Sequence, residues 1–186
     1  MVRLMAGFGG AGAEAIFEAM KQKISEMVFL GLGANLGDRR ATMEQARRLL
    51  EEGGFKTTLA SAFYETPPWG KTSQPPFINQ VLGGSFAGAP MELLALAMEV
   101  EGKLGRERRE VWGPRTLDID ILLFGRTVLR TQRLTVPHPF LTRRAFVLYP
   151  LAEIAPVLVP PGEQDTVSNL LAALPDDDLK GIVQLA

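Results

Sequence analysis

The feature of this sequence that most limits its fold is the order in which two hydrophobic periodicities follow one another. Alternating or continuous apolar runs, typical of strands, cover residues 27–35, 55–66, 77–86 and 116–124. Apolar residues three and four apart, typical of helices, cover residues 38–52 and 90–104. The order β-α-β-β-α-β predicts an α+β fold, a ferredoxin-like antiparallel sheet with helices packed on one face. We expect the other face of the sheet and its loops to carry a functional site.

Further elements are predicted on both sides of this core. Residues 11–26 predict an amphipathic helix, with apolar residues at helical spacing at Ile16, Phe17, Met20 and Ile24. The extra C-terminal β and α elements are one or two short strands in 127–136, a loop and short helix in 137–156, and a helix in 166–174. The acidic run 176–178 predicts a solvated tail. We expect residues 27–186 to form one domain and residues 1–26 to be an N-terminal extension.

Composition excludes several classes of protein. The chain has 186 residues and no cysteine, which excludes a disulfide framework, a thiolate metal site and a cysteine nucleophile. No apolar run approaches the roughly 20 residues that a membrane helix needs. Glycines and Glu14 break the apolar run at the N-terminus, which makes it a poor signal peptide. We therefore expect a cytoplasmic protein.

Two aspartates interrupt the apolar strand 116–124. Alternation places Asp118 and Asp120 on one face and the apolar residues on the other, at Leu117, Ile119, Ile121 and Leu123. Aspartates two residues apart have Cα atoms roughly 6.6–6.8 Å apart, and unit charges at that distance repel by about 2.5 kcal/mol at an effective dielectric of about 20. Mg²⁺ would remove this cost, since it binds carboxylates together with substrate phosphates. The alternative is an exposed strand face with two hydrated carboxylates.

Basic residues are concentrated around this strand. Residues 103–144 contain ten Lys and Arg and four Asp and Glu, a net charge of +6, whereas the whole chain has a net charge of −1. A local positive field in a near-neutral protein favours a compact anionic ligand over a long polyanion. A solvated basic face is the alternative. Arginines and the only histidine next to an aspartate pair are typical of phosphoryl-type transfer.

Five motifs then stand in the order found in one enzyme family. They are GLGANLGDR (31–39), YETPPWG…QPPFIN (64–79), WGPRTLDIDILLFG (112–125), LTVPHP (134–139) and RRAFVLYPLAEIAP (143–156). Together they resemble 6-hydroxymethyl-7,8-dihydropterin pyrophosphokinase of folate synthesis, from about Met27 to Pro161. The resemblance implies transfer of the β,γ-pyrophosphoryl group of ATP to the hydroxymethyl oxygen of the pterin, with release of AMP. It also implies two Mg²⁺ ions, small-molecule substrates and no nucleic acid or membrane partner. It leaves a monomer and a weak dimer open.

The resemblance also implies roles for individual residues. The metal ligands are Asp118 and Asp120, and the catalytic residues are Arg106, Arg115, Asp118 and Asp120. The ATP-binding residues are Glu101, Arg106, Trp112, Arg115, Ile121, Arg133, Thr135, His138 and Arg144. The pterin-binding residues are Thr66, Pro67, Trp69, Phe77, Asn79, Trp112, Asp118 and Phe146. Of these, Phe77 and Phe146 stack on the pterin ring and Asn79 bonds its edge. Segments 69–76 and 105–114 are expected lids that exclude water.

Two other classes of protein fit part of the sequence. Residues 7–12 match G-x-G-x-x-G and open a helix, as in a dinucleotide-binding protein, but no series of parallel βαβ units follows. A non-catalytic ferredoxin-like module that binds an anion or a partner protein would explain the fold and the basic residues, but not the paired carboxylates. The sequence leaves open whether residues 1–26 dock on the domain, mediate self-association or belong to another activity.

Overall fold

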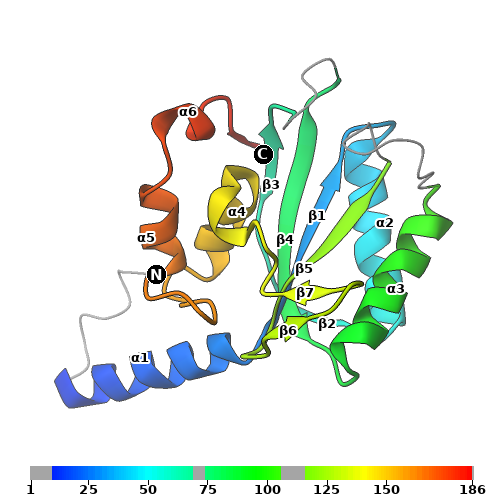
Figure 1. The fold of residues 1–186 in the computed structure, drawn as a ribbon. Coiled ribbons are helices and arrows are strands. Elements are labelled where there is room, and N and C mark those ends of the chain that lie inside the picture. Colours follow the sequence, from blue (N-terminus) through cyan, green and yellow to red (C-terminus); the bar gives the residue numbers. More distant parts are fainter. Residues whose placement is uncertain (1–9, 69–73, 106–115, 186) are drawn as a thin grey trace.

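The computed structural model describes residues 10–68, 74–105 and 116–185 (Figure 1). Within these residues a six-stranded antiparallel sheet forms the centre, with the order β5-β1-β4-β3-β8 and with β2 also paired to β4. Its strands are β1 (Val28–Ala34), β2 (Lys56–Ala60), β3 (Phe63–Thr66), β4 (Phe77–Ser85), β5 (Asp118–Phe124) and β8 (Val183–Leu185). The predicted α+β fold with an antiparallel sheet is confirmed.

The remaining elements lie around this sheet. The helices are α1 (Gly10–Ser25), α2 (Arg39–Glu52), α3 (Pro90–Lys103), α4 (Ala145–Ile154), α5 (Val167–Ala172) and α6 (Asp176–Leu179). A 3-10 turn, η2 (Leu141–Arg143), precedes α4, and a small hairpin follows β5, formed by β6 (Leu129–Arg130) and β7 (Thr135–Val136). Figure 1 shows α2 and α3 on one side of the sheet and α4 and α5 on the other. Among the described helices, none combines the length and the apolar character that crossing a bilayer requires.

The ends of the two core helices follow from local chemistry. The carboxylate of Asp38 accepts a hydrogen bond from the backbone N–H of Ala41 at 3.1 Å, which satisfies one of the free donors at the start of α2. Pro90 opens α3, where its missing N–H costs nothing. Gly54 lies in the turn after α2 with a φ of 97°, a conformation that favours glycine. These are the boundaries that the sequence predicts.

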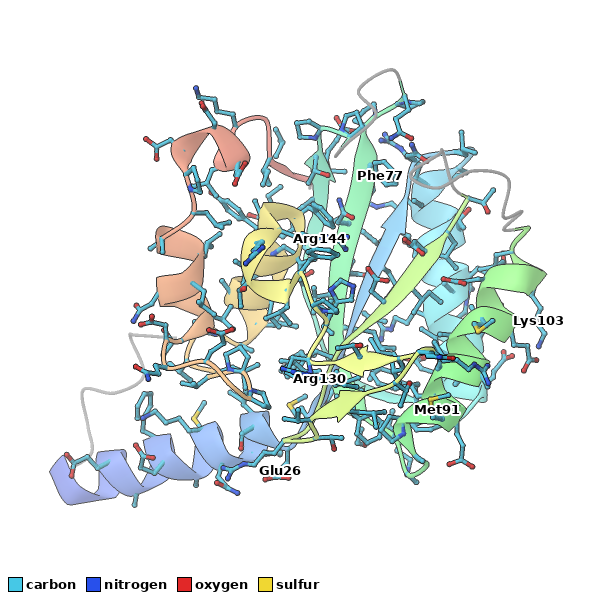
Figure 2. All side chains as sticks on the ribbon, in the orientation of Figure 1. Glu26, Phe77, Met91, Lys103, Arg130 and Arg144 are labelled. Atoms are coloured by element: carbon cyan, nitrogen blue, oxygen red, sulfur yellow. The ribbon has the colours of Figure 1, made fainter. Side chains whose placement is uncertain are left out.

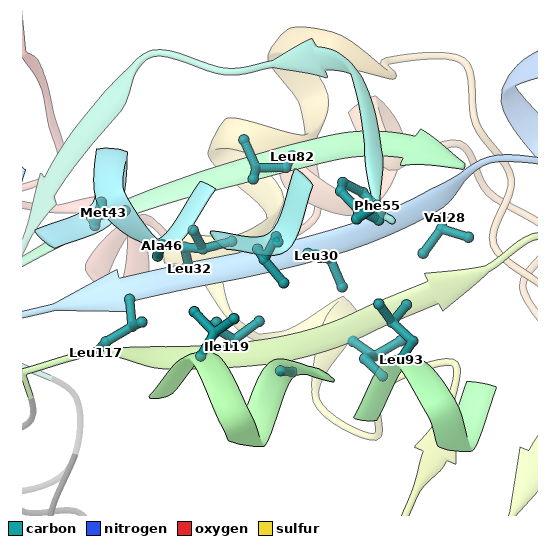
Figure 3. Close-up of a cluster of buried hydrophobic side chains, with 14 of the residues drawn as sticks. Val28, Leu30, Leu32, Met43, Ala46, Phe55, Leu82, Leu93, Leu117 and Ile119 are labelled. Atoms are coloured by element: carbon teal, nitrogen blue, oxygen red, sulfur yellow. The ribbon is translucent and has the colours of Figure 1, made fainter. Parts of the chain in front are cut away.

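The main core lies between the sheet and the pair α2–α3 (Figure 3). Alternate residues of β1 point into it, namely Val28, Leu30, Leu32 and Ala34. They meet Met43, Ala46 and Leu50 of α2 and Leu93 of α3, all fully or almost fully buried. Burial of each such leucine contributes about 1.5–3 kcal/mol, so this layer holds the two helices firmly on the sheet.

The opposite face of the sheet carries a second core. It joins the sheet, through Phe29, Val81 and Leu122, to α4 and α5. The helices contribute Leu148 and Leu151 of α4 and Val167 of α5. The C-terminal helices therefore cover part of the face that the sequence left open for a site. The side chain of Tyr64 on β3 anchors α4, because its hydroxyl donates to Glu153 at 3.0 Å. Burial and Glu153 raise the pKa of Tyr64 to about 12, so this hydroxyl remains a donor.

One predicted core position is wrong because strand β5 contains a β-bulge. The pairing of β1 with β5 shifts between Phe29 and Leu30, so that Phe29 pairs with Leu123 and Leu30 with Ile121. Leu122 is the extra residue, and the side chain of Leu123 turns to the α4 side. Leu117, Ile119 and Ile121 lie in the α2–α3 core, as predicted. Strict alternation cannot anticipate a bulge.

Two further predictions need correction. The strand predicted for 55–66 is interrupted after Ala60, where the Ser61 hydroxyl accepts a hydrogen bond from the backbone N–H of Val81 at 3.0 Å. The acidic run is not a simple tail, since its three aspartates form the first turn of α6, where the helix dipole favours negative charge. After α6 the chain returns as β8 and pairs with β3. A three-residue strand carries too little periodicity to be found in a sequence.

The predicted N-terminal helix is confirmed as α1, and its position relative to the core is now visible (Figure 1). Ile24 and Met27 pack against the second core, whereas Ile16 is 46% exposed. The guanidinium of Arg126, after β5, holds the end of α1 by bonding Gln22 at 2.8 Å and Ser25 at 3.2 Å. The division into an extension and a domain stays a prediction.

Two Gly→Ala substitutions test the packing of the sheet. A Cβ at Gly84 in β4 would collide with the backbone oxygen of Lys56 in β2, whereas a Cβ at Gly102 in α3 would meet nothing within 4 Å. We expect Gly84→Ala to lower the free energy of unfolding by about 1–3 kcal/mol. Gly102→Ala should raise it by up to about 1 kcal/mol, because alanine is the better helix former. Urea unfolding measures both changes in the free energy of unfolding. Changes of the same sign in the two variants would contradict this packing.

Candidate active site

Strand pairing brings the predicted site residues into rows across the α4 side of the sheet. Gly33 of β1 lies opposite Asp118 of β5 on one side and Asn79 of β4 on the other. The neighbouring row joins Asp120, Gly31 and Val81 in the same way. Residues directly opposite one another in a sheet point to the same face. The carboxylate pair and the amide of Asn79 therefore face the same space.

The two glycines leave the floor of this space without side chains. A Cβ at Gly33 would lie 3.0 Å from Oδ1 of Asn79, and a Cβ at Gly31 would lie 3.3 Å from a methyl carbon of Leu122. Any larger residue at Gly33 would therefore crowd the amide of Asn79. The glycines thus make room for neighbouring side chains, Asn79 and Phe77 beside Gly33 and Leu122 beside Gly31. The prediction missed these residues, although two glycines at i and i+2 in a buried strand are a visible sign.

A cation, Arg144, lies at the start of α4 (Figure 2). Arg144, the residue before α4, is buried, and its guanidinium nitrogen lies 3.5 Å from Oδ2 of Asp120. The guanidinium carbon lies 4.9 Å from the ring centre of Phe140 and 5.4 Å from that of Phe146. Both distances allow cation–π attraction. The two rings restrict the guanidinium to the side of the site where the aspartates lie.

His138 reaches the same carboxylate from the loop after β7. Its backbone N–H donates to the carbonyl of Leu122 at 2.9 Å, which ties the loop to the bulge of β5. Its Nδ1 accepts a hydrogen bond from the backbone N–H of Phe140 at 3.2 Å, so the ring proton is on Nε2. Nε2 lies 3.9 Å from Oδ2 of Asp120. Burial first, and then the charge of Arg144, lower the pKa of His138 to about 4, so this imidazole is neutral at pH 7.

The predicted pterin residues lie at the other end of the row. The amide nitrogen of Asn79 donates to the hydroxyl of Thr66 at 2.7 Å, and both side chains are buried. This bond leaves Oδ1 of Asn79 on the side of Gly33. Phe77 lies at the start of β4, near Gly33, and Pro67 is exposed just after β3. The structure therefore brings together Thr66, Phe77, Asn79 and the carboxylate pair.

The structure describes the surroundings of two residues predicted to bind ATP, Glu101 and Ile121. Glu101 of α3 is only 3% exposed, and its carboxylate accepts a hydrogen bond from the backbone N–H of Ile119 at 2.8 Å. This bond satisfies a donor on the outer edge of β5, between the two aspartates. The side chain of Ile121 lies in the α2–α3 core, on the opposite face of the sheet. A contact of Ile121 with the nucleotide would have to involve its backbone.

Other predicted residues lie in the hairpin or outside the described part of the chain. Arg133 is exposed in the turn between β6 and β7, and Thr135 is half-buried on β7. Trp69, Arg106, Trp112 and Arg115 lie outside the described residues, as do most of the two predicted lids. The roles of these residues stay predictions.

The acidic side chains offer a cation an incomplete set of ligands. Within the described residues, no group of three or more His, Asp and Glu side chains could hold a metal ion. Asp118 and Asp120, which pair with Gly33 and Gly31, supply two half-exposed carboxylates. This donor set suits Mg²⁺, which commonly binds one or two carboxylates and takes its other ligands from water and phosphate.

Comparison with known proteins identifies the family of this chain. Residues 29–156 match the family model of 7,8-dihydro-6-hydroxymethylpterin-pyrophosphokinase (HPPK). A Methylorubrum extorquens protein named 2-amino-4-hydroxy-6-hydroxymethyldihydropteridine pyrophosphokinase is 44% identical over 147 residues, 78% of this chain and 92% of the relative. An Aquifex aeolicus protein of the same name is 46% identical over 134 residues, 72% of this chain and 83% of the relative.

A solved structure shows the same fold. The Plasmodium falciparum HPPK-DHPS structure with pteroate superposes with a TM-score of 0.63 at 16% identity, over 78% of this chain. This chain spans 42% of that longer protein. The likeness therefore concerns the fold alone.

These matches define the class of protein as an ATP-dependent pyrophosphokinase. The chain belongs to the 7,8-dihydro-6-hydroxymethylpterin-pyrophosphokinase family, whose activity is transfer of pyrophosphate to hydroxymethyldihydropterin in folate biosynthesis. The alternative of a non-catalytic module is thereby wrong. The dinucleotide-binding alternative is also wrong, because every strand pair in the described sheet is antiparallel.

The half-buried neutral histidine predicts a pH dependence of stability. As the pH falls below 6.5, the unfolded chain takes up a proton on His138, whereas the folded protein does so only near pH 4. Stability contributed by the neutral ring is therefore complete above pH 6.5 and is lost between pH 6.5 and 4, by at most about 1.4 kcal/mol per pH unit. Urea unfolding at pH 7.5 and 5.0 should show a larger loss for the wild type than for His138→Gln. Equal losses would contradict a neutral imidazole at His138.

The bond between Glu101 and β5 predicts a graded effect of substitution. We expect Glu101→Ala to lower the free energy of unfolding by about 1–3 kcal/mol, because the backbone N–H of Ile119 loses its acceptor. Glu101→Gln keeps an acceptor oxygen and should cost clearly less. Glu99→Ala on the exposed side of α3 is the control, since its partner Lys103 is also on the surface. Thermal and urea unfolding measure the series, and equal costs for Ala and Gln at position 101 would contradict the interpretation.

Proposed function

We propose that the α4 side of the sheet is the active site, at which the hydroxymethyl oxygen of the pterin attacks the β-phosphorus of ATP. An O–Pβ bond forms, the bond between Pβ and the α,β-bridging oxygen breaks, AMP leaves, and the hydroxyl proton is released. The observation that carries this proposal is the row Asp118–Gly33–Asn79, in which only a glycine separates a carboxylate from a recognition amide. The hydroxymethyl arm of the substrate would lie above Gly33, between the two.

The pterin end of the site would be formed by β3, β4 and α4. The amide oxygen of Asn79 would accept a hydrogen bond from the edge of the pterin, while its nitrogen is held by Thr66. The rings of Phe77 and Phe146 would cover the faces of the pterin, at about 0.5–1.5 kcal/mol each beyond burial. Trp69, Trp112 and the backbone near Pro67 complete the proposed pterin contacts.

Asp118 and Asp120 would hold Mg²⁺ at the phosphate end, and we propose two ions, as the resemblance implies. Bound Mg²⁺ would neutralise the triphosphate charge and position its oxygens. The repulsion between two like charges on one strand supports this assignment, because a cation relieves it. Asp118, as the carboxylate in the row with Asn79, is also placed to accept a hydrogen bond from the substrate hydroxyl.

Arg144 and His138 would face the nucleotide from the α4 side. The guanidinium of Arg144 is buried and oriented by two rings, so it can bind a phosphate oxygen without losing much side-chain freedom. His138 is neutral and offers its Nε2–H as a donor to phosphate, without adding a charge. Arg106, Arg115, Arg133 and Thr135 are proposed as further ATP contacts. Glu101 and Ile121 would border the nucleotide near β5.

Removing one carboxylate charge at a time tests this proposal. We expect Asp118→Asn and Asp120→Asn each to lower kcat for pterin-dependent AMP release by about 10²- to 10³-fold, because a charge that holds the phosphate end is lost. Asp118→Asn should not lower the urea midpoint much, since it relieves repulsion between like charges, whereas Asp120→Asn also removes the countercharge of buried Arg144 and should lower it more. Asp178→Asn, on exposed α6, is the matched control and should keep wild-type turnover.

The measurement is chromatography of AMP formed from ATP, Mg²⁺ and 6-hydroxymethyl-7,8-dihydropterin. Wild-type turnover in either folded aspartate variant would contradict the assignment of the carboxylates. A folded wild type that forms no AMP would contradict the proposed site as a whole.

A further inference from the structure

The connection between β3 and β4 carries both ends of the proposed pterin site. Thr66 ends β3 and Phe77 begins β4, and the two residues are opposite one another in the sheet. The connecting segment therefore leaves and re-enters the sheet at the pterin site. Glu65 and Pro76 are the residues just before Thr66 and Phe77, so a contact that holds both restrains the strand ends that carry the hydroxyl of Thr66 and the ring of Phe77.

Arg39, the first residue of α2, bonds both of these neighbours. One of its terminal nitrogens lies 2.9 Å from Oε2 of Glu65, and the other donates to the carbonyl oxygen of Pro76 at 2.8 Å. Its side chain is 27% exposed and that of Glu65 is 36% exposed, so the ion pair is only partly screened by water. A single guanidinium thus connects the end of β3 with the start of β4.

The geometry of this contact requires arginine. A guanidinium is planar and presents its donors in a fixed fork, so it can bond a carboxylate and a carbonyl in two set directions at once. An ammonium group is a point charge without this fork. Lysine at this position could keep the ion pair with Glu65, but it could not hold both acceptors in the same relative position.

Arg39 is itself held in place. The carboxylate of Asp38 caps α2, and the buried face of α2 packs in the main core. From the same turn, the buried side chain of Asn35 donates to the carbonyl oxygen of Pro75 at 3.3 Å. The turn between β1 and α2 therefore gives the connection a rigid support. From this support, Arg39 bonds both ends of the connection, through Glu65 and Pro76.

We propose that Arg39 is a positioning residue for the pterin end of the site, an inference that rests on the proposed function. It acts through Glu65 and Pro76 and does not touch the substrate. The residues proposed for the phosphate end lie on β5, the loop after β7 and the start of α4, and none of these is bonded to Arg39 in the described contacts. Loss of Arg39 should therefore weaken pterin binding and leave ATP binding unchanged.

Steady-state kinetics of pterin-dependent AMP release test the inference. We expect Arg39→Ala to raise KM for the pterin by about 5- to 20-fold, with KM for ATP within about twofold of the wild type. Arg39→Lys should recover only part of this loss. Arg48→Ala, which removes an exposed arginine from the same helix, is the matched control and should change neither constant.

A double-mutant cycle with Glu65→Gln locates the effect. If Arg39 acts through Glu65, Arg39→Ala should raise KM for the pterin less in the Glu65→Gln background than in the wild type. Thermal unfolding of each variant separates positioning from loss of structure, and we expect the midpoint of Arg39→Ala to lie within a few degrees of the wild type.

Three results would overturn the inference. They are an unchanged KM for the pterin in Arg39→Ala, a parallel rise in both KM values, and full recovery by Arg39→Lys. Each of these requires an active wild type in the same assay. Absence of AMP from the wild type would instead overturn the proposed site, and the inference with it, so the two failures are distinguishable.

Discussion

The rest of the structure depends on the two different faces of β1. This strand lies between β5 and β4, and its alternate residues differ sharply in size. Leu30 and Leu32 hold α2 and α3 on one face, while on the other face Gly31 and Gly33 leave room for the side chains of Leu122 and Asn79. Period-two alternation thus lets one central strand support the main core and form the floor of the site. The fold can place a carboxylate and an amide in one row because nothing on β1 separates them.

Charge is distributed around this floor so that the site can accept an anion. Two carboxylates on adjacent same-face positions of β5 repel, and Arg144 lies close enough to Asp120 to offset part of that repulsion. The rings of Phe140 and Phe146 keep the guanidinium in place. His138 adds a hydrogen-bond donor without adding charge, because burial keeps it neutral. The site therefore combines fixed donors with a pair of acids that favours a cation.

Much of the fold was predictable because the core elements have clear periodicities. The β-α-β-β-α-β order, the limits of α2 and α3 and the two faces of residues 117–121 all follow from side-chain patterns and caps. The errors fall where local pattern has no influence. The bulge at Leu122, the interruption at Ser61 and the return of the chain as β8 each depend on a partner strand. Such partners are distant in the sequence.

By itself the sequence determined which residue types were available. It also indicated the family, because the five motifs occur in the order typical of that family. Only the tertiary structure decided which of those residues meet. Pairing register places Asp118, Gly33 and Asn79 in one row, although they are far apart along the chain. It also gives Arg39 two partners that no local pattern suggests. Register and the docking of helices arise from packing over the whole sheet, so they cannot be derived from any single segment.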